Sequence, residues 1–192
     1  MRKFLLGVSA VAAVTLTGCD GDNNAASTVD STPTSTSSAD QSSHNEQDVT
    51  FAQGMVPHHQ HGVDMAKMAG EKATSASVKD LASRIGGAQD EEIQQMTGML
   101  EQWGAPTTSG MEDGMSADEM GMMTPDEMQQ LEQTTGAAFD RLWVELMIKH
   151  HQGAVNMART ELAQGENADA KALAQKILDV QEAEITEMRA LA

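Results

Sequence analysis

An internal repeat constrains the fold of this chain more than any other feature. When the sequence is shifted by 92 residues, Met55–Met96 aligns with Met147–Met188 without a gap, and 16 of the 42 positions are identical. The identities include histidine and methionine, so the match indicates an internal duplication. One such unit is too small to bury a core of its own. We therefore expect the two units to pack against each other.

Each repeated unit has the pattern of two helices. In the first helix of each unit, a turn of about 100° per residue places the histidines, the methionines and several small residues on one face. The second helix has amphipathic spacing, and in the first unit Trp103–Pro106 supplies glycine and proline stop signals. Pro57 leaves two interpretations open, a kinked first helix or one that begins later. With no tyrosine and 3% aromatic residues, the chain favours helices over sheets. The sequence predicts an all-α fold, a four-helix bundle made of two duplicated two-helix units.

The N-terminal region has the composition of an export signal followed by a tether. Residues 1–18 have a short basic start and an apolar run that is too short to span a membrane. Leu-Thr-Gly before Cys19, the only cysteine, resembles a bacterial lipobox, in which this cysteine carries the lipid. The alternative is a coincidental cysteine after an ordinary signal peptide. Residues 19–47 are rich in serine and threonine, which is typical of a disordered tether.

The remaining residues, 48–192, form one predicted domain. Its two units cover about 48–104 and 137–192, and a connector covers about 105–136. The connector includes Gly110–Met128, with six methionines among acids and glycines. Because thioether sulfur is a soft ligand that favours Cu(I), this stretch is either a flexible copper-collecting loop or a disordered acidic linker. Within it, Thr124–Glu127 has the pattern of a capping box, which predicts a short helix to about Glu132.

Histidine pairs on the inward face of both units are the strongest chemical signal. Two adjacent inward histidines in each unit are hard to explain as packing, because buried imidazoles need polar partners. Thioether sulfur is soft and favours Cu(I), whereas imidazole suits copper and zinc. Glutamates repeated on the second helices could orient the imidazoles or bind directly. The predicted metal ligands are His58, His59, His150, His151, Met55, Met147, Met65 and Met157, with Glu92, Glu184, Met96 and Met188 as supporting residues.

Several alternatives bear on this site. Methionines on an apolar helical face often only fill the core. His61 falls off the shared face and has Gly153 as its counterpart, so we expect it to be peripheral. Other chemistries lack their motifs: the sequence contains neither Glu-x-x-His for a di-iron bundle nor His-Glu-x-x-His for a zinc protease. We therefore expect no enzymatic activity. The net charge of −17 argues against nucleic acid as a partner.

The twin motifs resemble a known family. Met-x-x-His-His-x-x-x-Val-x-Met-Ala, followed in each unit by Leu-Ala-x-x-Ile-x-x-x-Gln-x-x-Glu-Ile-x-x-Met, is similar to the family called domain of unknown function 305. The resemblance covers about Phe51 to the C-terminus. It implies an exported, ferritin-like four-helix bundle with copper bound at His58, His59, His150 and His151.

Two functions from different classes remain. The first is a copper-binding or copper-buffering protein, with Cu(I) favoured, anchored by lipid to the cell membrane and facing the periplasm or the extracellular side. Its partners would be the metal ion and the membrane, with a copper-accepting protein and a second copy of the chain as further candidates. The alternative is a structural or pH-responsive helical lipoprotein whose histidines form a buried network without metal.

Overall fold

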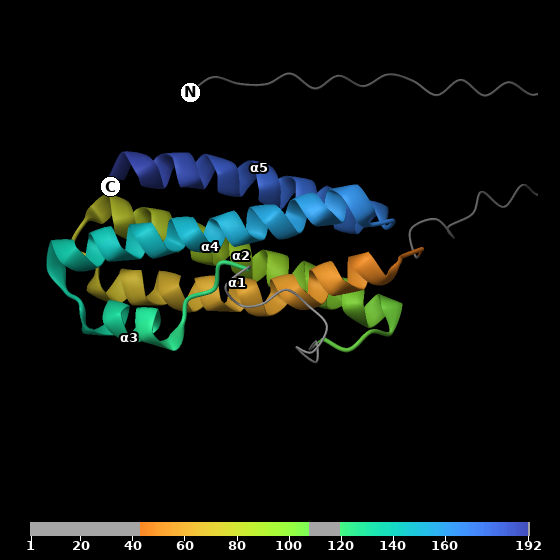
Figure 1. Ribbon diagram of the computed structural model, residues 1–192, viewed down its shortest axis with the longest axis horizontal. Coiled ribbons are helices and arrows are strands. Elements are labelled where there is room, and N and C mark those ends of the chain that lie inside the picture. Colours follow the sequence, from red (N-terminus) through yellow and green to blue (C-terminus); the bar gives the residue numbers. More distant parts are fainter. Residues whose placement is uncertain (1–42, 108–119, 192) are drawn as a thin grey trace, which may run out of the picture. The chain divides into compact units, whose positions relative to one another are not determined.

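The computed structural model describes residues 43–107 and 120–191, and within them it contains five helices and no strand (Figure 1). The predicted all-α class is therefore confirmed. Cys19, the signal segment, nearly all of the tether and residues 108–119 of the connector lie outside the described residues. The helices are α1 (Glu46–Lys72), α2 (Ala76–Trp103), α3 (Pro125–Gln133), α4 (Gly136–Gln164) and α5 (Ala168–Leu191).

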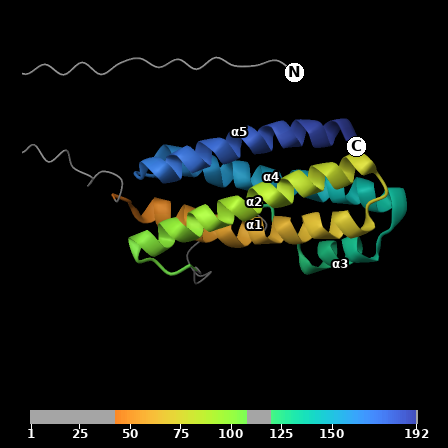
Figure 2. The ribbon, with the colours of Figure 1, turned by 180° about the vertical axis from the view of Figure 1, so that it is seen from behind.

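The four long helices form the bundle as two hairpins. Helix α1 pairs with α2, α4 pairs with α5, and the hairpins meet mainly along α1 and α4. Figures 1 and 2 show α1 and α4 side by side and running in opposite directions, with the short α3 at one end. This is the bundle of two two-helix units that the repeat predicted. None of the helices among the described residues is both long and apolar enough to cross a membrane.

The helix ends follow local sequence signals. Helix α2 ends at Gly104, whose φ of 67° lies in the left-handed region that glycine adopts without strain. Helix α3 begins with the predicted capping box, in which the Thr124 side chain and Glu127 each accept the other's backbone N–H. Pro57 lies inside α1. The interpretation that the first helix begins after Pro57 is therefore wrong.

Two equivalent aspartates connect α1 and α4, the first helices of the two units, to the turn of the other unit. Asp140, in the first turns of α4, accepts the backbone N–H groups of Thr74 and Ser75 at 2.9 Å each, in the turn between α1 and α2. Asp48, 92 residues earlier, accepts the backbone N–H of Asn167 at 2.9 Å, in the turn between α4 and α5. Each unit thus supplies a carboxylate that accepts the backbone N–H groups of the other unit's turn. These hydrogen bonds help to fix how the two hairpins pack together.

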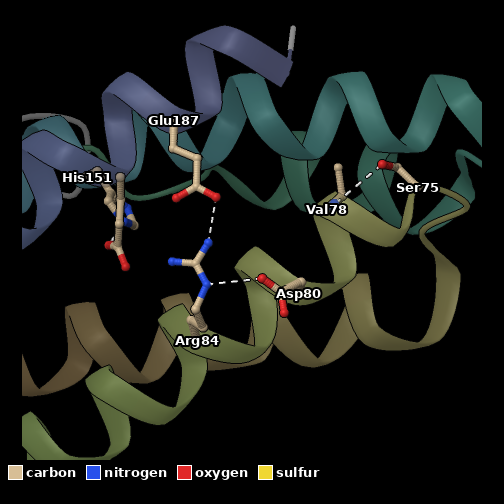
Figure 3. Close-up of polar contacts among 7 residues, drawn as sticks. Ser75, Val78, Asp80, Arg84, His151 and Glu187 are labelled. Atoms are coloured by element: carbon tan, nitrogen blue, oxygen red, sulfur yellow. Dashed lines mark hydrogen bonds and ion pairs between the residues drawn. The ribbon is translucent and has the colours of Figure 1, made fainter.

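Helices α2 and α5 are joined at the surface by an ion-pair cluster. Arg84 donates to Asp80 at 3.2 Å and to Glu187 at 2.5 Å (Figure 3). All three side chains are largely exposed, so water screens the pairs and each contributes little to stability. Figure 3 also shows Ser75 capping α2 by accepting the backbone N–H of Val78.

Candidate metal site

The four paired histidines lie in the interior where α1 meets α4. His58 and His59 on α1 and His150 and His151 on α4 are all fully buried. The rings of His58 and His150 stack with centroids 3.7 Å apart and planes 22° apart. The helical-face argument placed these residues inside, and the packing of the two units brings one histidine of each pair into direct contact.

Backbone carbonyls hold the stacked pair. His58 Nε2 lies 2.9 Å from the carbonyl oxygen of Met120, and His150 Nε2 lies 3.0 Å from the carbonyl oxygen of His58. Because a carbonyl oxygen only accepts, both imidazoles donate through Nε2. Burial, with a further contribution from neighbouring histidines, lowers the pKa of both rings well below the usual value, so they are neutral at pH 7. Nδ1 of each ring therefore carries the lone pair.

Glutamates hold the other two histidines. His59 Nε2 is 2.9 Å from Glu92 Oε2, and His151 Nε2 is 2.8 Å from Glu184 Oε2. Burial by itself would raise the pKa of Glu92, but its contacts with His59 and Lys176 outweigh burial and lower the pKa. The ionised carboxylate accepts, so His59 donates through Nε2. Metal-binding histidines commonly present this arrangement, one ring nitrogen bonded to a carboxylate and the other free for the metal.

All four buried histidines leave Nδ1 without a hydrogen-bond partner among the described residues. A buried polar atom without a partner is uncommon and costs free energy, so each instance needs an explanation. Here Nδ1 lacks a hydrogen-bond partner in four histidines, which occupy equivalent positions of the two units. In the described part of the chain, however, no three His, Cys, Asp or Glu side chains converge as a metal centre. Histidine and carboxylate alone do not complete a site in this arrangement.

The methionines supply sulfur on both sides of the histidines. All six predicted methionines are buried, and they divide between two core clusters. Each cluster draws on both units, because α1 and α4 run antiparallel. The structure therefore does not gather the sulfurs in one place, but in two groups that flank the histidine layer. One cluster contains Met55, Met96 and Met157, and the other contains Met65, Met147 and Met188.

His61, expected to be peripheral, belongs to the histidine group. Its ring centroid is 5.4 Å from that of His150, and the residue is only partly exposed. Its Nδ1 is buried without a hydrogen-bond partner in the described residues. Burial lowers the pKa of His61, and the carboxylate of Asp64 opposes that shift. The helical wheel missed this contact because it gives a residue's direction on its own helix, not the helix that approaches it.

In the second unit, the position equivalent to His61 is covered by the connector. Gly153 is the counterpart of His61, and a Cβ atom there would lie 1.6 Å from the carbonyl oxygen of Met120. Gly121, with φ of +71°, also packs closely on α4, because a Cβ atom there would lie 2.4 Å from the carbonyl oxygen of Lys149. Glycine at both positions lets the chain before α3 lie directly on α4. The same carbonyl of Met120 then accepts from His58.

Comparison with known proteins identifies the family and the fold. Residues 48–192 match the family model described as domain of unknown function DUF305. A DUF305 fragment from Deinococcus radiodurans is 33% identical with a TM-score of 0.70, covering 77% of this chain and 95% of that one. A putative secreted DUF305 protein from Streptomyces coelicolor is 32% identical with a TM-score of 0.68, covering 76% and 89%.

A third similar structure carries a metal. CopM in its Cu(II)-bound form is 35% identical with a TM-score of 0.64, covering 75% of this chain and 94% of that one. CopM structures with Cu(I) and with Ag are also similar to this chain. No curated protein sequence matches. From the repeated motifs, the helical bundle and these similarities, the chain belongs to the DUF305 family.

Proposed function

We propose that this domain binds copper, preferentially Cu(I), through the Nδ1 atoms of its buried histidines together with methionine sulfur. The role is storage or delivery outside the cytoplasm, by a protein anchored to the membrane through Cys19, and no reaction is catalysed. The observation that carries the proposal is the set of four buried Nδ1 atoms with no partner among the described residues. Each belongs to an imidazole whose Nε2 is already bonded.

The chemistry of these atoms favours a soft cation. A neutral imidazole that donates through Nε2 can offer Nδ1 only to a proton donor or a metal ion. In the described residues no donor forms a hydrogen bond with any of these Nδ1 atoms, and buried methionines and aliphatic side chains form the core clusters on either side of the histidines. Thioether sulfur adds affinity for Cu(I) but little for Zn²⁺ or Ca²⁺. The similarity to CopM, which has Cu(I)- and Cu(II)-bound structures, supports the same choice.

Methionine must complete the coordination, because histidine and carboxylate do not converge as a centre in the described residues. The two methionine clusters lie one to two helical turns from the histidines along α1 and α4. A rotamer change at an unbranched methionine can move its sulfur by several ångströms without unfolding the core. We therefore expect binding to rearrange methionine side chains and to leave the helices in place.

A Cu(I) competition titration of the full chain against a chromophoric chelator tests the proposal. The informative variant combines His59→Gln and His151→Gln, because a glutamine amide can still donate to Glu92 and Glu184. The matched control is His44→Gln, since the His44 ring stacks on Trp103, with centroids 4.9 Å apart, and is not part of the paired motifs. We expect tight binding by the parent and the control, and at least about a tenfold loss in the double variant.

Equal affinity in the parent and the folded double variant would contradict a site at the histidine pairs. Circular dichroism establishes that each variant is folded. Removing all four paired histidines is the stronger test of the site, but it also opens a cavity in the core and endangers the fold. Binding that persists in a folded quadruple variant would place the copper elsewhere in the chain.

A second candidate function has its own support. Backbone carbonyls cap both stacked histidines, which a metal-free polar network also needs. In that case the bundle would be a structural or pH-responsive module. No binding of Cu(I) by the parent chain, together with acid-induced loosening of the folded state, would favour this alternative.

A further inference from the structure

Three imidazoles extend in a series from the edge of the bundle to its interior. His61 is partly exposed, whereas His150 and His58 are fully buried. Ring centroids are 5.4 Å apart between His61 and His150 and 3.7 Å apart between His150 and His58. In each ring Nδ1 is buried and has no hydrogen-bond partner in the described part of the protein. A series of unused nitrogen ligands therefore leads inward from His61.

Only the first unit carries this outer imidazole. The equivalent position in the second unit is Gly153, where the carbonyl of Met120 lies so close that no side chain fits. The connector thus covers the bundle on the α4 side, and the histidine stands on the α1 side. The two units therefore differ at this position, and of the five histidines in the group only His61 is partly exposed in the described part of the chain.

The charge around His61 favours a cation. Asp64 is one turn further along α1, is exposed, and interacts electrostatically with the His61 ring. Its carboxylate also lies 3.6 Å from Nζ of Lys67, in an exposed pair that water screens. A nearby carboxylate raises the local concentration of positive ions. The large negative net charge of the chain, −17, acts in the same direction.

We propose that His61 is the outer ligand that first binds Cu(I) and transfers it to His150, and so sets the rate of metal uptake. This proposal rests on the proposed copper-binding function. The transfer is a ligand exchange without electron transfer: a bond from Cu(I) to His150 Nδ1 forms as the bond to His61 breaks. Because His61 is not needed to hold the ion at its final position, its loss changes rates more than affinity.

The test compares uptake by the full chain and two variants, His61→Ala and His61→Gln. Rapid mixing with a Cu(I)–chelator complex gives the uptake rate from the change in chelator absorbance, and the end point gives the affinity. We expect both variants to take up Cu(I) about tenfold more slowly or worse. Their affinity at equilibrium should stay within about threefold of the parent. His44→Gln, which removes an imidazole outside this series, should leave both quantities unchanged.

The outcomes distinguish this proposal from the one on which it rests. Unchanged uptake in His61→Ala would overturn the role of His61 while leaving copper binding intact. Normal uptake in His61→Gln beside slow uptake in His61→Ala would also overturn it, because the residue would then act by filling space. A loss of affinity without a loss of rate would make His61 a resident ligand instead. A parent chain that binds no Cu(I) would overturn both proposals.

Discussion

His58 and His150 are 92 residues apart, and their rings stack at 3.7 Å between centroids. Each ring comes from a different repeated unit, and the Nε2 of His150 donates to the backbone carbonyl of His58. Neither unit can form this contact alone. The histidine group therefore forms only when the two hairpins pack against each other. Formation of the candidate site depends on assembly of the bundle.

The glutamates that hold His59 and His151 should control metal affinity. We expect Glu92→Gln and Glu184→Gln each to weaken Cu(I) binding by about 10–100-fold, because the imidazole loses the carboxylate that orients it and increases its basicity. Chelator competition measures the affinity. Glu182→Gln is the control, since the side chain of Glu182 is half exposed and forms an ion pair with Arg159 at the surface. Unchanged affinity in the two buried variants would show that the carboxylates have no part in binding.

The close contact at Gly153 should make this glycine essential for stability. In Gly153→Ala the new Cβ would overlap the carbonyl of Met120, so the connector must move and His58 loses its acceptor. We expect the free energy of unfolding to fall by about 1–3 kcal/mol, measured by urea denaturation. Gly87→Ala is the matched control, because no described atom beyond its own chain neighbours and the adjacent helix backbone lies within 4 Å of its new Cβ. It should stabilise α2 by about 0.5–1 kcal/mol. Similar unfolding midpoints for the two variants would contradict the packing described here.

Much of the fold follows from the sequence because helical periodicity reports which face of each helix is buried. The duplicated pattern predicted the two hairpins, the buried histidine pairs and the stop at Gly104, and the capping box at Thr124 gave the start of α3. Apart from the repeat itself, each of these depends on residues within a few positions of one another. Local physical chemistry is therefore sufficient to predict them.

The remaining features of the site depend on which helices pack against each other. Helical periodicity within one segment does not predict this packing. The antiparallel contact of α1 with α4 places Met55 beside Met157, so the sulfurs form two groups, not one. The contact of His61 with His150 has the same origin. The stacking of His58 on His150 likewise joins distant segments. Extending the repeat alignment upstream shows that Asp48 and Asp140 are equivalent positions. It does not show that each accepts hydrogen bonds from the turn of the other unit.

Asp140 should stabilise the bundle by holding the turn of the other hairpin. Burial by itself would raise its pKa, but hydrogen bonds from Thr74 and Ser75 outweigh burial and lower the pKa. Asp140→Asn replaces an accepting oxygen with an amide that faces these donors, so we expect a loss of about 1–3 kcal/mol in the free energy of unfolding at pH 7. Urea denaturation gives the value. Asp90→Asn, at an exposed position of α2, should change it little. An equal effect at both positions would assign the loss to net charge.

Glu161 should make the protein less stable as the pH rises. Its side chain is fully buried, and its carboxyl group interacts with the carboxylate of Asp48. Burial, and then the neighbouring Asp48, raise its pKa from 4.5 to about 8. Between these values the folded state holds a proton that the unfolded state has released. The stabilisation is therefore complete below the unfolded pKa of 4.5 and is lost as the pH rises through 8.

Glu161→Gln removes this titration, because the amide cannot ionise and can donate to Asp48 as the protonated acid does. We expect the variant and the parent to differ little at pH 5, and the variant to be more stable by about 1–2 kcal/mol at pH 9. Urea denaturation across this range measures the difference. Glu145→Gln, at an exposed position of the same helix, should give a difference that does not change with pH. A flat difference for Glu161→Gln as well would mean that Glu161 is already ionised at neutral pH in the folded protein.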